Sequence, residues 1–266
     1  MLVHSRLGRL SAWVLFMVLF VPIFGFPLFT VLLMGVAKDW SSMLPTSLTL
    51  SHLIDAIQGE GRVTLLTSLE TALIASVVAM AVGTWGALAA HHSSARFRMV
   101  VDGAFLVPIA VPSVVIGLGL LVGFSREPFR LNGLPLLVVI AHVVLVLAFA
   151  YSTATSSLAR SDPAFAQIAA SLGARPGYVL RRVTLPLLTP ALIAGAGLSF
   201  ALSMGELGAT IMVYPANFAT QPVKIFQITD KSADFLAGGA YTTVLLIATV
   251  VVLGALSLIR NKATQR

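Results

Sequence analysis

Residues 161–190 read SDPAFAQIAASLGARPGYVLRRVTLPLLTP, and this polar stretch lies between long apolar segments. Asp162 can cap a helix that starts at Pro163, because proline has no amide hydrogen to lose there and its φ is already helical. Four apolar residues then fall at i, i+3, i+4 and i+7 on one face, namely Phe165, Ile168, Ala169 and Leu172. Gly173 follows where a left-handed residue commonly ends a helix. The pattern predicts a short, capped, amphipathic helix.

A second segment starts at Pro176, carries Arg181 and Arg182 near its end, and is predicted to stop at Pro186. Ten residues extend only about 15 Å at the helical rise, which is too short to cross a bilayer. We therefore expect both segments to be non-spanning, and the apolar face of the first to dock onto another protein. The alternative, from periodicity alone, is that this face lies against lipid headgroups.

The rest of the chain is strongly apolar. Of its 266 residues, 58% are hydrophobic and 10% are charged, with a mean hydropathy of +0.96. Soluble domains contain about 25% charged residues. The composition predicts an all-α, polytopic membrane protein in which residues 1–266 form a single domain. Its six predicted spans cover residues 10–36, 65–90, 99–124, 134–158, 187–213 and 240–259, with a loop at 159–186.

The first apolar run is predicted to be an uncleaved span. It continues to about Val36, beyond the 7–15 apolar residues of a signal peptide, and no A-x-A site closes it. Pro22 and Pro27 are expected to bend this span. Ser51 is expected to cap a short helix at the membrane surface.

Basic residues are unevenly divided between the two sides that six spans define. The side with both termini has Arg6, Arg9, Arg96, Arg98, Arg160, Arg175, Arg181, Arg182, Arg260, Lys262 and Arg266. The other side has Lys38, Arg62, Arg126, Arg130, Lys224 and Lys231. The positive-inside rule makes the richer side, with both termini and the 159–186 loop, cytoplasmic. It also explains the net charge of +7 better than nucleic-acid binding does.

Enzyme chemistry is not predicted. The chain has no cysteine, which excludes disulfides and thiolate metal sites. His91 and His92 are adjacent and would point about 100° apart on a helix, which disfavours a shared metal. The motifs H-E-x-x-H, G-x-S-x-G and G-x-x-x-x-G-K-[ST] are all missing. We therefore expect no metal, no cofactor and no ATP hydrolysis in this chain.

Three acids lie in or near apolar spans, where charges are commonly functional. Glu70 and Asp102 are close to span ends and are expected to sit at the membrane interface. Glu206 lies deep in the fifth span between Gly205 and Gly208, where backbone irregularity costs little. One interpretation is a broken helix beside a polar translocation pathway formed by Gly205, Glu206 and Gly208. The other is that Glu206 hydrogen-bonds a neighbouring helix and only holds the bundle together.

The 161–190 stretch resembles the cytoplasmic loop of binding-protein-dependent ABC importer permeases. That family's signature is E-A-A, three residues, G, nine residues and I-x-L-P; the matching positions begin at Gln167 and end at Pro186. The spacing matches, whereas Gln167 replaces the acid and Ile168 replaces the first alanine. The resemblance implies that the loop is a coupling helix that docks onto an ATPase. The residues it implies for coupling are Phe165, Gln167, Ile168, Ala169, Ser171, Leu172, Gly173, Leu185 and Pro186.

The resemblance extends over about residues 45–259. FLVPIAVPSVVIGLGLL (105–121) resembles the third span of the same permeases. SMGELGATIMVYP (203–215), followed by TQPVKIF (220–226), resembles the fifth-span exit of the branch that imports iron, thiamine, sulfate and phosphonates. Over its whole length the match is most similar to the 2-aminoethylphosphonate permeases. It implies a type I, MetI-like permease of the bacterial inner membrane. It also implies a second permease subunit, related or identical, and a periplasmic binding protein.

The family further implies two cytoplasmic ATPase subunits, which bind ATP and Mg²⁺. Fe³⁺, thiamine, sulfate or a polyamine are alternative substrates for the same fold. An ATPase-independent secondary transporter or channel is the alternative from another class. It would be expected to show two related halves with interrupted spans, which the sequence does not display.

Overall fold

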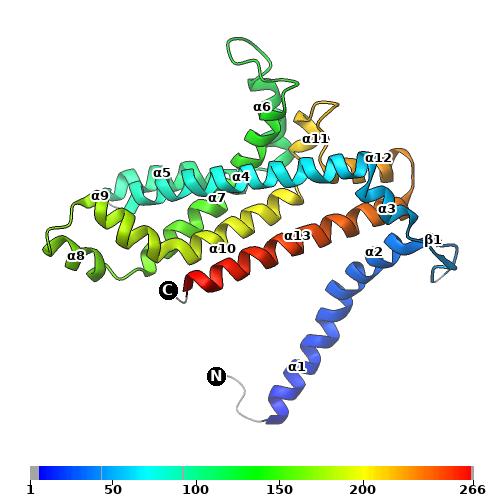
Figure 1. Cartoon of the computed structure of the whole chain (residues 1–266), viewed down its shortest axis with the longest axis horizontal. Helices are drawn as coiled ribbons and strands as arrows, with labels where there is room; N and C mark the ends of the chain where they lie inside the picture. The colour runs from blue at the N-terminus through cyan, green and yellow to red at the C-terminus, as the bar shows by residue number, and fades with distance from the viewer. Residues whose placement is uncertain (1–5, 43, 92, 265–266) are drawn as a thin grey trace. The chain divides into compact units, whose positions relative to one another are not determined.

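The computed structural model describes residues 6–42, 44–91 and 93–264, and these are predominantly helical (Figure 1). His92 and Arg266, named above, lie outside the described residues. The elements are α1 (Arg6–Phe20), α2 (Phe26–Val36), β1 (Ala37–Asp39), β2 (Ser47–Leu48), α3 (Ser51–Ile57), α4 (Gly59–His91), α5 (Ala95–Ala110), α6 (Ser113–Gly123), α7 (Pro135–Arg160), α8 (Ala164–Ser171), α9 (Pro176–Val179), α10 (Leu185–Met204), α11 (Thr210–Val213), α12 (Gln221–Lys231) and α13 (Phe235–Thr264). The strands β1 and β2 pair antiparallel.

The membrane-spanning pattern agrees with the prediction. In the described residues, five helices are long and apolar enough to cross a bilayer, and a bent helix pair makes up to six. The five are Gly8–Val36, Gly59–His91, Pro135–Arg160, Pro176–Met204 and Phe235–Lys262. In the first, the π-helical turn Val21–Gly25 accommodates Pro22, and the flanking Phe20 and Phe26 keep helical dihedral angles.

The third predicted span, 99–124, corresponds to a bent pair of helices and not to one straight helix. Helices α5 and α6 are bent by 107° at a short break. Pro112 disfavours a helical conformation at the residue before it, and Val111 is extended, with φ −101° and ψ 129°. Pro108, inside α5, removes one further helical donor.

The fifth predicted span, 187–213, is wrong at both ends. Helix α9 continues through the π-helical turn Leu180–Thr184 into α10, so the chain is helical from Pro176 to Met204 and does not stop at Pro186. Pro186 is the second residue of α10 and directly follows the π-helical turn, whose different hydrogen-bond pattern accommodates the missing amide hydrogen. At the other end the helix stops at Met204, and helical structure resumes only with α11.

The chain divides into two compact units, each described by itself. The first combines the residues up to Val63 with Ile225–Leu246, and the second combines Thr64–Lys224 with the residues from Ile247 onward. Helices α4, α12 and α13 contribute residues to both units, and the single-domain assignment stays a prediction. In the first unit, Ser51 is the first residue of α3 and not its cap, because its amide donates to Thr49 Oγ1 at 3.1 Å.

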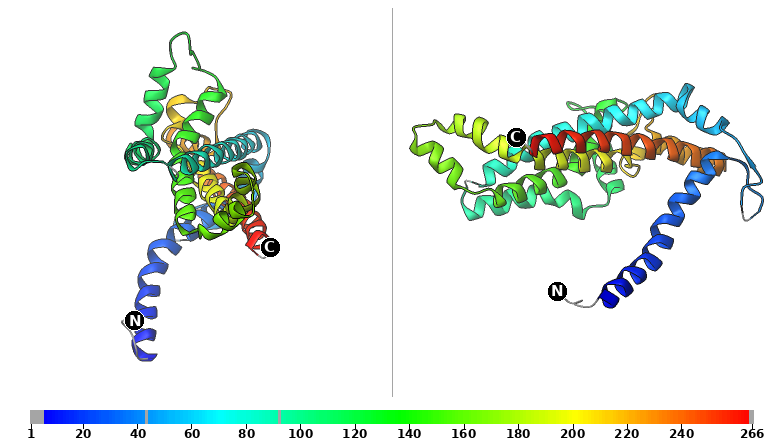
Figure 2. Two further views of the ribbon diagram at one scale, coloured as in Figure 1. Left: turned by 90° about the vertical axis from the view of Figure 1, so that its left-hand side faces the viewer. Right: turned by 60° about the horizontal axis from the view of Figure 1, so that its bottom comes forward.

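Helix α7 is the centre of the second unit. Its residues belong to all three buried apolar clusters, which it shares with α4, α10 and the α11 segment. Close approach of α4 depends on Gly83, where an added Cβ would lie 2.8 Å from the Tyr151 amide nitrogen. Helices α8 and α9 project beyond one end of α7 and α10 (Figure 1, Figure 2). The central helix therefore leads directly into the predicted coupling loop.

The 220–226 stretch is anchored to α4 in the second unit. Thr64 Oγ1 donates a hydrogen bond of 2.6 Å to Gln221 Oε1, and the Gln221 amide donates to Ser68 Oγ at 2.7 Å. All three side chains are buried. This polar contact fixes the start of α12 against a membrane-spanning helix.

Candidate functional site

The loop helix α8 begins at Ala164, one residue later than the predicted Pro163. Asp162 Oδ1 accepts a hydrogen bond of 2.9 Å from the Ala164 amide, and Ala164 is the first helical residue. Asp162 therefore caps the helix and satisfies one of the amides that lack a partner in the first turn.

The end of α8 confirms the predicted left-handed residue. Gly173 has φ +84°. Its amide donates to the Ala170 carbonyl at 2.9 Å, and the Ala174 amide donates to the Ala169 carbonyl at 3.1 Å. This pair of bonds is the Schellman motif, and it requires a residue that tolerates positive φ.

The apolar face of α8 is uncovered among the described residues. Phe165, Ile168 and Leu172 are 55%, 58% and 82% exposed. Ala169 is half-buried, and Gln167 and Ser171 are exposed. On α10, Leu185 is half-buried and Pro186 is exposed. Three large apolar side chains on one short, rigidly capped helix are typical of a surface that binds a partner.

A second candidate site, which we name the break pocket, lies where the two broken helices meet. It is a cavity of about 180 Å³ in the second unit. Its walls come from the α5–α6 bend, from α7 and from the chain around the end of α10. They comprise Pro108, Ile109, Val111, Ser113, His142, Leu145, Val146, Phe149, Leu202, Ser203 and Glu206. The α5–α6 bend and the break after α10 therefore contribute to one cavity.

Glu206 lines the break pocket and also organises the break itself. Its Oε1 accepts a hydrogen bond of 2.7 Å from the Ala209 amide, so it caps the short helix α11. The helix is broken between Met204 and Thr210, as the first of the two interpretations of Glu206 proposes. This bond joins the carboxylate to its own segment and not to a neighbouring helix.

The two glycines beside Glu206 have different roles. An added Cβ at Gly208 would clash with Ser113 Oγ and lie 3.1 Å from Val114 Cγ2, so only glycine lets α6 approach. Gly205 has φ −93° and no atom closer than 3.9 Å to such a Cβ, so neither conformation nor space requires glycine there. Neither glycine is among the residues that line the pocket.

His142 is the residue of this site that the sequence analysis missed. It is 2% exposed on α7 and joins both sides of the break. Its Nδ1 lies 2.6 Å from Ser203 Oγ, in the last turn of α10, and its Nε2 lies 2.8 Å from Thr210 Oγ1, at the start of α11. The available signal was a single histidine in the middle of the apolar 134–158 run.

The partners of His142 define the direction of each hydrogen bond. Thr210 Oγ1 donates to the Glu206 carbonyl at 3.4 Å, so it accepts from Nε2–H of the imidazole. Nδ1 then carries no proton and accepts from the Ser203 hydroxyl. A neutral imidazole satisfies all these contacts, and it holds the ends of the broken span at fixed positions.

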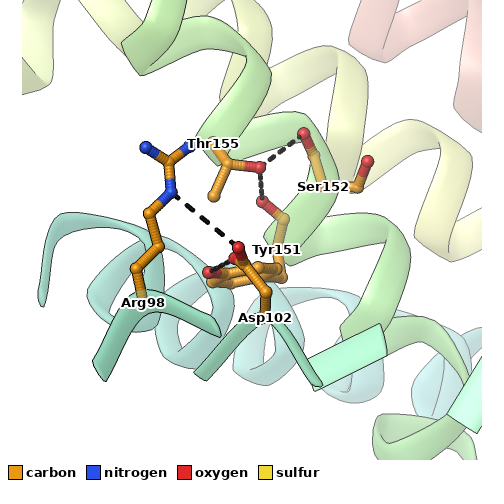
Figure 3. Close-up of polar contacts among 5 residues, drawn as sticks. All are labelled: Arg98, Asp102, Tyr151, Ser152 and Thr155. Carbon is orange, nitrogen blue, oxygen red and sulfur yellow. Dashed lines mark hydrogen bonds and ion pairs between the residues drawn. The ribbon is translucent and has the colours of Figure 1, made fainter. Parts of the chain in front are cut away.

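A polar clamp attaches α5 to α7 (Figure 3). The Tyr151 hydroxyl donates to Asp102 Oδ1, and Arg98 Nε lies 3.8 Å from Asp102 Oδ2. The ring of Tyr151 also stacks on Phe105, with centroids 4.5 Å apart. The sequence predicts only that Asp102 lies near the membrane interface. In the structure it connects the broken third span to the central helix.

Comparison with known proteins identifies the family. The model described as "Binding-protein-dependent transport system inner membrane component" matches residues 83–263. The chain belongs to this family. It is therefore the permease of an ABC importer and a multi-pass protein of the inner membrane.

Two relatives illustrate the match in sequence. The permease is 42% identical over 253 residues, 95% of each chain, to the "Putative 2-aminoethylphosphonate transport system permease protein PhnV" of Salmonella typhi. It is 34% identical over 205 residues to the molybdenum transport system permease protein ModB of Mycobacterium tuberculosis, covering 71% of the permease and 76% of ModB.

The fold matches a crystal structure of a bacterial alginate ABC transporter in complex with a pentasaccharide-bound periplasmic protein. The TM-score is 0.76 and the identity 16%, with coverage of 96% of the permease and 95% of that chain. This likeness shows the MetI-like importer fold that the sequence predicts.

Proposed function

We propose that this permease imports 2-aminoethylphosphonate. The observation that carries the proposal is the 42% identity to PhnV, which extends over 95% of both chains. The match to ModB, a molybdenum transport permease, covers 71% of the permease at 34% identity and makes molybdenum the competing substrate. 2-Aminoethylphosphonate carries an anionic phosphonate and a cationic ammonium.

The break pocket supports this substrate class. Its volume of about 180 Å³ suits a small solute and not a large one. Glu206 uses Oε1 to cap α11, while a carboxylate has a second oxygen that can accept from an ammonium. Ser113, which lines the pocket from the α5–α6 bend, offers a hydroxyl to an anionic group. We propose that Glu206 contacts the ammonium as substrate passes.

We propose that α8 docks onto a cytoplasmic ATPase dimer, which binds ATP and Mg²⁺. The exposed face of Phe165, Ile168 and Leu172 supports this role, because full burial of such side chains contributes about 1.5–3 kcal/mol each. A second permease subunit and a periplasmic binding protein complete the proposed importer. The matched alginate transporter, which was crystallised with a periplasmic protein, supports delivery of the substrate by a binding protein.

Movement of the docked loop would reach the break pocket through a continuous helix. The 29 residues from Pro176 to Met204 form one helical segment, roughly 43 Å long, which ends beside Ser203. The loop is also joined to α7, which carries Tyr151 and His142. ATP-dependent closure of the partner would then shift both ends of the break and open the pocket alternately to each side.

Uptake of radiolabelled 2-aminoethylphosphonate tests the substrate. Cells that lack this permease should lose uptake and growth on the phosphonate as sole phosphorus source, and the restored chain should recover both. Excess molybdate, sulfate, thiamine, Fe³⁺ or spermidine should leave uptake unchanged. Unchanged uptake without the permease, or competition by one of these solutes, would contradict the assignment.

Co-purification separates the importer from an ATPase-independent transporter. An ATPase subunit should be recovered with the permease, and uptake should stop when it is removed. Full uptake in proteoliposomes that contain the permease without an ATPase would exclude the proposed mechanism.

A further inference from the structure

A groove between α10 and α13 begins beside the coupling loop and extends along these two helices. It consists of two cavities of about 850 and 240 Å³ that share Ile193, and we name it the α10–α13 groove. Arg182, Lys262 and Ile259 line the larger cavity. Leu198 and Leu253 line the smaller one. All of these residues belong to the second unit.

The groove is charged at one end and apolar along its length. Arg182 lies just before α10, and Lys262 lies in the last turns of α13. None of the described residues that line either cavity is acidic. Toward the middle of the two helices the walls are Ile193, Leu198 and Leu253, with Arg260 at the margin of the smaller cavity.

The apolar part is kept open by a small residue. An added Cβ at Gly197 would lie 3.4 Å from Leu253 Cδ2 and 3.7 Å from Leu256 Cδ1, which is ordinary contact distance. Gly197 therefore leaves a gap between α10 and α13 that one added methyl group would fill. The apolar walls of the cavity around it suit a flexible hydrocarbon chain, because its affinity comes from buried apolar area without directional contacts.

We propose that the α10–α13 groove binds an anionic phospholipid. The phosphate lies between Arg182 and Lys262, and an acyl chain follows α10 and α13 past Gly197. Basic pockets between membrane helices on the cytoplasmic side bind anionic headgroups in this way. The two cations without a lining carboxylate favour a headgroup with net negative charge over a zwitterionic one. The groove adjoins Phe165, so the lipid would support the base of the coupling loop.

Native mass spectrometry of the intact importer, titrated with phosphatidylglycerol or phosphatidylcholine, tests the proposal. Each basic residue near an anionic headgroup strengthens binding roughly fivefold. Arg182→Gln with Lys262→Gln should therefore weaken phosphatidylglycerol binding roughly 25-fold and leave phosphatidylcholine binding unchanged. Arg181→Gln is the matched control, since Arg181 is exposed but does not line the groove. An equal loss in this control would overturn the site.

A second pair of variants tests the acyl channel. Gly197→Leu should displace both lipids, whereas Gly254→Leu should displace neither, because an added Cβ at Gly254 has no atom within 4 Å. The chain has no cysteine, so Ser257→Cys, in the groove wall, can carry a single photo-crosslinker. Crosslinks to lipid are expected. Crosslinks to the second permease subunit would show that a protein fills the groove and would overturn the proposal.

Discussion

The loop helix α8 and the break pocket, in the same unit of the permease, differ in how their backbones are held. In α8 the backbone is fixed by local bonds from Asp162 and Gly173, and the large side chains are left exposed. In the break pocket the backbone is interrupted, and buried His142 bonds the side-chain hydroxyls of Ser203 and Thr210 on the two sides of the interruption. A rigid backbone with an exposed apolar face suits docking, whereas an interrupted backbone with internal polar contacts suits a segment that changes shape.

A substitution of Leu172 is expected to have the largest effect on docking through the apolar face of α8. Leu172→Asp should weaken association with the ATPase by at least about 100-fold, because apolar burial is lost and a charge must be desolvated. The permease should remain folded, since Leu172 is 82% exposed. Pull-down of the ATPase measures the effect. Ala170→Asp introduces the same charge on the other face of α8 and should retain the ATPase; equal loss in both variants would contradict docking through the apolar face.

A substitution of His142 tests the hydrogen bonds that hold the break pocket together. His142→Ala removes two hydrogen bonds, leaves the buried Ser203 hydroxyl without its imidazole acceptor and creates a cavity, which should lower the free energy of unfolding by about 2–4 kcal/mol. Thermal unfolding of the purified permease measures this. His91→Ala, at an exposed position at the end of α4, should change it by less than about 0.5 kcal/mol. A similar effect of both variants would exclude a bridging role for His142.

Substitutions of Gly173 test whether its left-handed conformation fixes the end of α8. Gly173→Ala places a side chain at φ +84° and should cost about 1–2 kcal/mol in the local turn. Gly177→Ala, within helix α9, should be neutral or favourable by up to about 1 kcal/mol. Hydrogen exchange of the loop amides compares the two.

Gly173→Val should leave the permease in the membrane but lose the ATPase; normal ATPase binding with full uptake would contradict the coupling role.

The smallest effect is expected at the clamp between α5 and α7. Tyr151→Phe removes the hydroxyl that donates to Asp102 and should lower the free energy of unfolding by about 1 kcal/mol. A double-mutant cycle with Asp102→Asn measures the coupling between the two residues. Additive effects would show that the clamp does not connect the two helices.

The loop could be predicted because its determinants are local. Capping by Asp162 and the left-handed Gly173 follow from adjacent residues, and the family spacing names the same glycine. The break at Glu206 could also be anticipated, since a charge between two glycines in an apolar run disfavours a regular helix. These features depend on sequence neighbours and not on the packing of distant helices.

The remaining features depend on tertiary structure. The 107° bend at Val111 was missed because its prolines lie inside a run that is apolar enough for one span. Continuity through Pro186 was missed because a π-helical turn absorbs the proline. The partners of His142 lie 61 and 68 residues away in the chain, and only the folded bundle brings them together.

The central claim is that α8 couples the permease to ATP hydrolysis while the break pocket passes the substrate. ATPase rate and 2-aminoethylphosphonate uptake, measured in the same proteoliposomes, test it most directly. For Glu206→Gln, compared with Glu70→Gln as an exposed control, the account predicts a bound, active ATPase and at least about tenfold lower uptake, because the ammonium loses its charged partner. For Leu172→Asp, it predicts that both activities fall together. Full uptake by Glu206→Gln, or hydrolysis that continues without uptake in Leu172→Asp, would contradict it.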